Sequence, residues 1–237
     1  MPVKTHPSVI PDAPAPQKSK SPRRGTFISL EGPEGCGKST QVRRLIDKLK
    51  TLGKWTVEAR EPGGTATGEA IRNILQHDLA GEPIGAEAET LLFEASRAQL
   101  CRRVILPALE AGAWVISDRF FDSTTAYQGY GRKLPVGKLL VLHAFAVCGA
   151  VPDLTLLLDI DVETGFQRLQ KRQKSGGVGP DRMEREERAF HERVREGYLA
   201  LAKKWPQRIR VIDASKDPDD VFGAIWREIE NAGRLTD

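Results

Sequence analysis

Residues 32–39 read G-P-E-G-C-G-K-S and constrain the fold of this chain more than any other segment. They match the pattern G-x-x-x-x-G-K-[ST], in which glycines allow backbone N–H groups to turn inward around phosphate oxygens. The apolar run 26–30 precedes the motif, and apolar residues at helical spacing follow it over residues 42–52. A strand, a glycine-rich turn and a helix in this order predict a phosphate site at a helix N-terminus.

The motif also assigns roles to its side chains. Lys38 would contact the β and γ oxygens of ATP, and the hydroxyl of Ser39 would be a ligand of Mg²⁺. Cys36 is either a small packing residue or a thiol activated by Lys38 and the helix terminus. The predicted ATP-binding loop comprises Gly32, Pro33, Glu34, Gly35, Cys36, Gly37, Lys38, Ser39 and Thr40.

Four further apolar runs, at residues 55–59, 114–116, 154–158 and 208–212, alternate with segments of helical period. Short buried strands that alternate with helices are typical of a parallel α/β sheet. We therefore predict a P-loop NTPase fold, with three α/β/α layers around a five-stranded parallel sheet. Residues 87–110 should form a long helix that Pro107 kinks or locally breaks.

Composition indicates where the folded domain begins and which partners and compartment the chain suits. Residues 1–24 are rich in Pro, Lys and Ser without an apolar run, so we expect a disordered extension before one P-loop domain at 25–237. Net charge is only +4 among interleaved acids and bases, which argues against a nucleic-acid partner. No apolar run approaches the ~20 residues that cross a bilayer. Three distant cysteines suit reduced thiols in the cytoplasm.

One basic, glycine-containing segment, residues 171–184, has no apolar periodicity and lies between two helical patterns. We expect it to be a mobile lid over the phosphate site.

Five segments, taken in order, resemble thymidylate kinases of the bacterial type over nearly all of residues 25–237. They are E-G-P-E-G-C-G-K-S-T from Glu31, R-E-P-G-G-T from Arg60, L-L-F-E-A-S-R from Leu91, D-R-F-F-D-S-T-T-A-Y-Q-G from Asp118 and P-D-L-T-L-L-L-D from Pro152. The resemblance implies transfer of the γ-phosphoryl group of MgATP to dTMP. It also implies a homodimer, for which the helix at 87–110 is a candidate interface.

The resemblance implies an acceptor site as well. Arg72 and Arg119 would hold the dTMP phosphate, although an arginine in either place can also serve a surface ion pair. Phe93 and Arg97 lie four apart, so on one helix face the ring can stack on thymine while the guanidinium reaches a ring oxygen. A phenylalanine in an apolar stripe is otherwise a core residue.

Four more residues complete the implied site. Thr124 and Gln128 match positions that hydrogen-bond the pyrimidine edge, and Tyr127 matches the residue that crowds the ribose 2′ position. Asp118 follows a strand that resembles the Walker-B strand, where a carboxylate holds Mg²⁺ directly or through water.

Two carboxylates, Glu34 and Glu61, each have two interpretations. Glu34, in the P-loop, matches an acid near the acceptor or the metal, and Glu61 matches an acid lining the acceptor site. Each is alternatively a solvated loop carboxylate.

Catalysis needs a cation that offsets charge on the transferred group. Some thymidylate kinases carry an arginine in the P-loop where this chain has Gly35, so the lid must supply it. Arg172 and Arg182 are the candidates beside Lys38, Arg119 and Glu34 in the catalytic set, and solvated lid charges are the alternative. For Arg182→Ala the resemblance leads us to expect a ~100-fold or larger fall in kcat with little change in KM.

Three rival functions remain at this stage. A related P-loop kinase could act on a deoxynucleoside or another monophosphate. A P-loop switch would order a loop for a macromolecular partner, but it needs no second set of arginine, aromatic and amide groups. DNA binding rests only on the mild positive charge.

Overall fold

A five-stranded parallel sheet forms the centre of the computed structural model, which describes residues 24–77, 81–174, 179–233 and 235. The strand order is β2-β3-β1-β4-β5, and every neighbouring pair is parallel. All five predicted strands are confirmed, with ends shifted by one or two residues. Their bounds are β1 Phe27–Glu31, β2 Thr56–Arg60, β3 Trp114–Asp118, β4 Leu154–Asp159 and β5 Ile209–Asp213.

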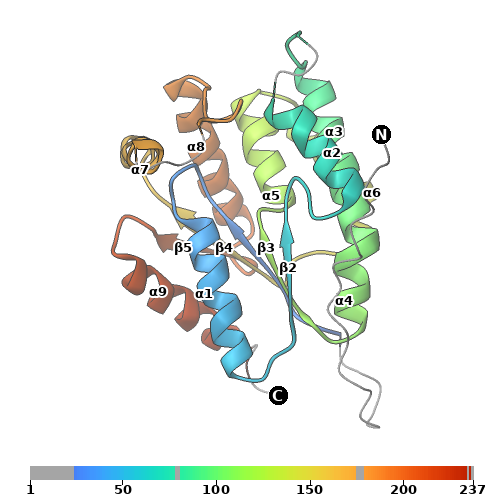
Figure 1. The fold of residues 1–237 in the computed structure, drawn as a ribbon, viewed down its shortest axis with the longest axis vertical. Coiled ribbons are helices and arrows are strands. Elements are labelled where there is room, and N and C mark those ends of the chain that lie inside the picture. The colour runs from blue at the N-terminus through green and yellow to red at the C-terminus, as the bar shows by residue number, and fades with distance from the viewer. Residues whose placement is uncertain (1–23, 78–80, 175–178, 234, 236–237) are drawn as a thin grey trace.

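Helices connect the strands and cover both faces of the sheet (Figure 1). They are α1 Lys38–Thr51, α2 Ala66–Gln76, α3 Ala86–Leu100, α4 Leu106–Glu110, α5 Phe121–Thr124, α6 Val136–Val147, α7 Val162–Lys174, α8 Arg188–Lys204 and α9 Pro218–Asn231. Two π-helical segments, Cys101–Ile105 and Thr125–Gly131, follow α3 and α5.

Alternation along the strands produces the three predicted layers. On β1, Ile28 and Leu30 belong to the core beneath α1 and α9, whereas Phe27 packs into the opposite core with the α3–α4 segment. A third cluster packs α8 and the Thr125–Gly131 segment against β4 and β5. Figure 1 shows α1 and α9 on one side of the sheet and the α3–α4 column at the right of the view.

The predicted long helix is continuous from α3 to α4 but changes its winding before Pro107. Residues Cys101–Ile105 are π-helical, and Pro107 stands in the first turn of α4. Proline lacks an N–H and would clash with the carbonyl one α-helical turn earlier, so a wider turn at this point accommodates it. The predicted irregularity is confirmed, and it takes the form of a π-bulge.

Two predicted segments are described only in part. Residues 1–23 of the predicted extension lie outside the described residues; the guanidinium of Arg24 forms an ion pair with Asp153 at 3.1 Å. Residues 175–178 of the predicted lid also lie outside them, while residues 171–174 form the last turn of α7. Among the described residues, no helix is long and apolar enough to cross a bilayer.

Core packing under α1 can be tested with two leucines from the same region. Leu45 is fully buried, whereas Leu52, at the C-terminal end of α1, is 47% exposed. We expect Leu45→Ala to lower the free energy of unfolding by about 2–5 kcal/mol, because it removes buried methyl groups and leaves a cavity. Leu52→Ala should cost less than about 1 kcal/mol. Urea unfolding followed by circular dichroism measures both, and equal losses would contradict this packing.

Candidate active site

A cavity of about 850 Å³ opens at the carboxyl ends of the strands. Its walls come from the P-loop, β2, α2, α3, the turn after β3 and α7, together with residues 179–181, 183 and 184. This is the edge at which parallel α/β sheets bind ligands. Eight lysine or arginine residues and five acids line it, so its charge suits anionic substrates.

The P-loop joins β1 to α1 with the geometry that its sequence predicts. Gly32, Gly35 and Gly37 have φ values of 145°, 73° and 91°, which side-chain-bearing residues rarely adopt, and Gly37 precedes α1 directly. Lys38 is 7% exposed, and its ammonium donates to the carbonyl oxygens of Gly32 and Pro33, both at 3.0 Å. Lys38 therefore lies across the loop at the start of the helix.

Ser39 and Asp118 meet across the carboxyl edge of the sheet. The Ser39 hydroxyl donates to Asp118 Oδ2 at 2.7 Å, and Asp118 is the last residue of β3. A hydroxyl and a carboxylate this close form a hard-oxygen donor set of the kind that Mg²⁺ prefers. The two residues predicted as metal ligands thus fit that ion.

Arg119 and Glu34 form a half-buried ion pair beside the P-loop. Arg119 Nη2 lies 2.6 Å from Glu34 Oε1, which also accepts a hydrogen bond from the Tyr127 hydroxyl at 2.8 Å. Burial alone would raise the pKa of Glu34, but the charges of Arg119 and Lys38 outweigh it and lower that pKa to about 2. Glu34 is therefore a fixed anion that orients Arg119.

The backbone of Arg119 and of the residues after it is also held by the end of β1. Its φ is 71°, and its N–H donates to Leu30 O at 3.0 Å. The next N–H, that of Phe120, donates to Glu31 Oε1 at 2.7 Å, and the Ser123 hydroxyl donates to Glu31 Oε2 at 2.5 Å. Burial, and secondly the Asp122 carboxylate, raise the pKa of Glu31 to about 8. The end of β1 thus fixes the turn that carries Arg119.

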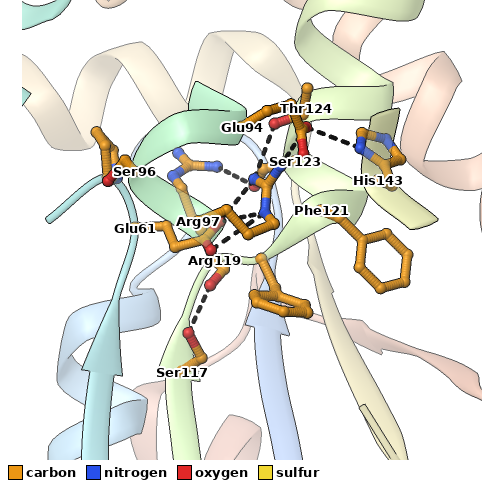
Figure 2. A network of polar contacts seen from close by, with 12 residues as sticks. Glu61, Glu94, Ser96, Arg97, Ser117, Arg119, Phe121, Ser123, Thr124 and His143 are labelled. Atoms are coloured by element: carbon orange, nitrogen blue, oxygen red, sulfur yellow. Dashed lines mark hydrogen bonds and ion pairs between the residues drawn. The ribbon is translucent and has the colours of Figure 1, made fainter. Parts of the chain in front are cut away.

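Arg97 lies at the centre of a buried network (Figure 2). Only 1% of it is exposed; its guanidinium donates to Glu61, with the shortest contact 2.6 Å, to Thr124 Oγ1 at 2.9 Å and to Glu94. Glu94 also contacts His143 Nδ1 at 2.8 Å. Four of the five Arg97 N–H groups are thereby used, and the fifth, on Nη1, has no hydrogen bond to another described residue.

Glu61 shares this arginine with Glu94. Burial raises the pKa of Glu61 to about 7, although the Arg97 charge and its hydrogen bonds oppose the shift. Glu61 is 5% exposed yet lines the cavity, so it is no solvated loop carboxylate.

The other predicted acceptor residues also line the cavity. Arg72 is half-buried and donates to Pro62 O at 2.9 Å; burial and the neighbouring Arg60 lower its pKa. Phe93 is half-buried on α3. The remaining cavity-lining residues predicted for the acceptor are Arg97, Arg119, Thr124, Tyr127 and Gln128.

The two lid arginines lie in different places. Arg172, on α7, lines the cavity and lies 2.9 Å from Glu184. Arg182 is 12% exposed at its side chain, donates to Leu75 O at 2.9 Å and lies 2.6 Å from Glu89 Oε2. In this structure Arg182 therefore contacts the wall formed by α2 and α3, and Arg172 is the lid arginine that faces the cavity.

Cys36 is 3% exposed and belongs to the core cluster beneath α1. Its burial agrees with the packing interpretation of this residue, and Lys38 Nζ lies 3.5 Å from its Sγ.

Several residues of the site were not anticipated. Tyr198 of α8 accepts a hydrogen bond from Arg119 Nη1 at 3.1 Å, and Arg168 of α7 donates to Ala214 O at 2.8 Å. Neither is near a motif in the sequence. Glu94, by contrast, precedes Arg97 by three residues, a spacing that predicts an ion pair on a helix.

Comparisons with known proteins agree with this geometry. A family model described as thymidylate kinase matches residues 30–225. A thymidylate kinase from Methylococcus capsulatus is 49% identical over 87% of this chain and 96% of its own length, and one from Syntrophotalea carbinolica is 46% identical over 88% and 97%. The crystal structure of thymidylate kinase from Ehrlichia chaffeensis matches with a TM-score of 0.69 and 31% identity, over 87% of this chain and 99% of that one. This chain belongs to the thymidylate kinase family.

Proposed function

We propose that the chain transfers the γ-phosphoryl group of ATP to dTMP and forms dTDP for DNA synthesis. The observation that carries the proposal is that a single cavity joins Lys38 and Ser39 of the P-loop to Arg72, Arg119 and Phe93. A loop that binds a triphosphate and a second site that binds a monophosphate must face each other for direct transfer.

The donor site is the P-loop. Its N–H groups and the N-terminus of α1 would bind the β-phosphate, and Lys38 would exchange its loop carbonyl partners for β and γ oxygens. Arg168 holds the carbonyls of Ala214 and Ser215 at 2.8 and 3.0 Å, which shapes the loop after β5 beside this site. That loop would contact the adenine.

Ser39 and Asp118 would hold Mg²⁺ directly or through water. When bound, the ion offsets negative charge on the phosphate oxygens of ATP. The 2.7 Å contact between the two residues already places both oxygens at one point of the cavity.

The acceptor site aligns the monophosphate. Arg119 and Arg72 would bind its phosphate, while Phe93 would stack on thymine and Tyr127 would lie against the 2′ position of the sugar. Transfer passes through a loose transition state, so the residues mainly need to align the two phosphates and stabilise charge. The phosphate of dTMP is already a nucleophile and needs no strong base.

Packing between the P-loop and α7 supports Arg172 as the lid cation. A Cβ at Gly35 would lie 2.3 Å from Gly165 O, and one at Gly165 would lie 2.6 Å from Glu34 O. Helix α7 thus contacts the loop closely at Gly165. Arg172 follows seven residues later on the same face of α7, which directs it toward the same cavity as the P-loop.

We further propose a cytoplasmic homodimer. Helices α3 and α6 pack together, and they expose Leu91 by 55%, Val141 by 70% and Phe145 by 84%. Exposed apolar side chains gathered on two adjacent helices favour a self-complementary interface with a second copy. The three free cysteines agree with a reducing compartment.

The function can be tested by coupled ADP detection with each deoxynucleoside monophosphate and with deoxynucleosides. We expect ADP to form fastest with dTMP, and only when Mg²⁺ is present. Strong ADP formation with another acceptor and none with dTMP would favour a related kinase. ATP turnover that is indifferent to any acceptor would favour a nucleotide-dependent switch.

Arg172 and Arg182 can be separated by kinetics. Because Arg172 faces the cavity, we expect Arg172→Ala to lower kcat ~100-fold with little change in the KM for dTMP. Arg182→Ala, which removes a contact of Glu89, should change kcat less and KM more. The larger effect is thus expected for Arg172→Ala, whereas the resemblance alone led us to expect it for Arg182→Ala. A large loss of kcat confined to Arg182→Ala would restore the earlier assignment.

The dimer interface can be tested by sedimentation. We expect Phe145→Glu to give monomers at micromolar concentration, because it places a charge in an apolar interface. Leu199→Glu, at a residue 38% exposed on α8, is the matched control and should remain dimeric. A dimeric Phe145→Glu variant would exclude this surface as the interface.

A further inference from the structure

Glu89 is a wholly buried carboxylate on α3 with no part in the chemistry described so far. Its exposure is 0%, and it lies among three donors. Gln128 Nε2 donates to Oε1 at 2.8 Å, Arg132 donates to both oxygens at 3.2 and 3.1 Å, and Arg182 lies 2.6 Å from Oε2. Burial of a charge costs free energy, so a wholly buried carboxylate with this many donors suggests a specific role for it.

The contact with Gln128 decides which end of its amide faces the cavity. Burial alone would raise the pKa of Glu89, but the hydrogen bonds from Arg132 and Gln128 lower it, so the carboxylate is ionised and can only accept. The amide must then present its NH₂ group to Glu89. Gln128 lines the cavity, and no hydrogen bond from another described residue occupies its carbonyl oxygen.

The hydrogen-bonding roles of the neighbouring Thr124 and Arg97 are fixed too. Arg97 donates to Thr124 Oγ1 at 2.9 Å, so the hydroxyl hydrogen of Thr124 is available as a donor. The remaining Arg97 N–H is a second donor. One acceptor with two donors complements a pyrimidine whose N3–H lies between two carbonyl oxygens. Cytosine has an acceptor at N3 and a donor at N4, and mismatches two of the three groups.

We propose that Glu89 is a positioning residue that holds the Gln128 carbonyl oxygen toward the acceptor site, and that it thereby excludes monophosphates whose pyrimidine lacks an N3–H. The proposal rests on the function proposed above for this site. A cytosine there would set its N3 lone pair against the fixed carbonyl oxygen and leave both without a donor.

The test measures kcat/KM for dTMP, dUMP and dCMP with Glu89→Gln. A neutral side chain at this position can donate as well as accept, so the Gln128 amide becomes free to present either end. We expect the dTMP:dCMP ratio of kcat/KM to fall ~10-fold or more, while the dTMP:dUMP ratio stays unchanged because both bases carry N3–H. Glu87→Gln, at an exposed residue of the same helix, should change neither ratio.

A purely structural role would lower kcat/KM equally for all three substrates, and that result overturns the proposal. Gln128→Met should lower the dTMP:dCMP ratio by itself, and Glu89→Gln should lower it no further in that background. An equal additional fall would show that Glu89 acts through another group.

Removal of one buried charge also leaves its partners unpaired. If circular dichroism shows Glu89→Gln to be unfolded, the double variant with Arg132→Gln restores charge balance, and its dTMP:dCMP ratio decides in the same way. The wild-type protein distinguishes a failure of the proposed function from a failure of the role proposed for Glu89. Wild-type protein that fails to phosphorylate dTMP contradicts the proposed function, whereas a preference for dTMP that persists in the variants contradicts only the role of Glu89.

Discussion

The buried carboxyl group of Glu31 holds together the two halves of the site. It ends β1, immediately before the P-loop, and accepts hydrogen bonds from the Phe120 N–H and the Ser123 hydroxyl, which lie at the start of α5 just after β3. The same turn carries Arg119 in a left-handed conformation. The P-loop and the turn that carries Arg119 are thereby both fixed to the end of β1. Phosphoryl transfer depends on alignment, so this contact sets the geometry on which the remaining residues act.

Around that point, the cationic side chains are oriented by carboxylates before any substrate binds. Glu34 orients Arg119, and Glu61 with Glu94 orients Arg97. Fixed charges of this kind need little reorganisation during the reaction, which is the main advantage of a preorganised site. Burial raises the pKa of both acids, but nearby cations lower that of Glu34 to about 2, whereas the pKa of Glu61 stays raised at about 7. Glu34 lies near two cations, whereas Glu61 shares a single arginine with another acid.

Local patterns predicted the elements well, because alternation and helical period report which face of each segment is buried. The P-loop and all five strands follow from such patterns. The partners of the arginines do not, since they join residues far apart in the chain: Arg97 meets Glu61 across 36 positions, and Arg119 meets Glu34 across 85. The family resemblance implied that Arg97 and Arg119 contact the substrate. It did not reveal that Arg97 already uses four of its five donors within the protein, or that Arg182 lies against Glu89.

At Gly35, one packing contact explains why the P-loop carries no side chain at this position. The sequence shows only that the loop lacks an arginine there, and the structure supplies a reason. A side chain at Gly35 would begin 2.3 Å from a backbone oxygen of α7, and φ at this residue is 73°. An arginine would therefore require α7 to move away from the loop. With α7 in place, the helix itself presents a cation from the face that touches the P-loop. The same glycine–glycine contact thus leaves no room for a side chain in the loop and holds against it the helix that carries the cavity-lining Arg172.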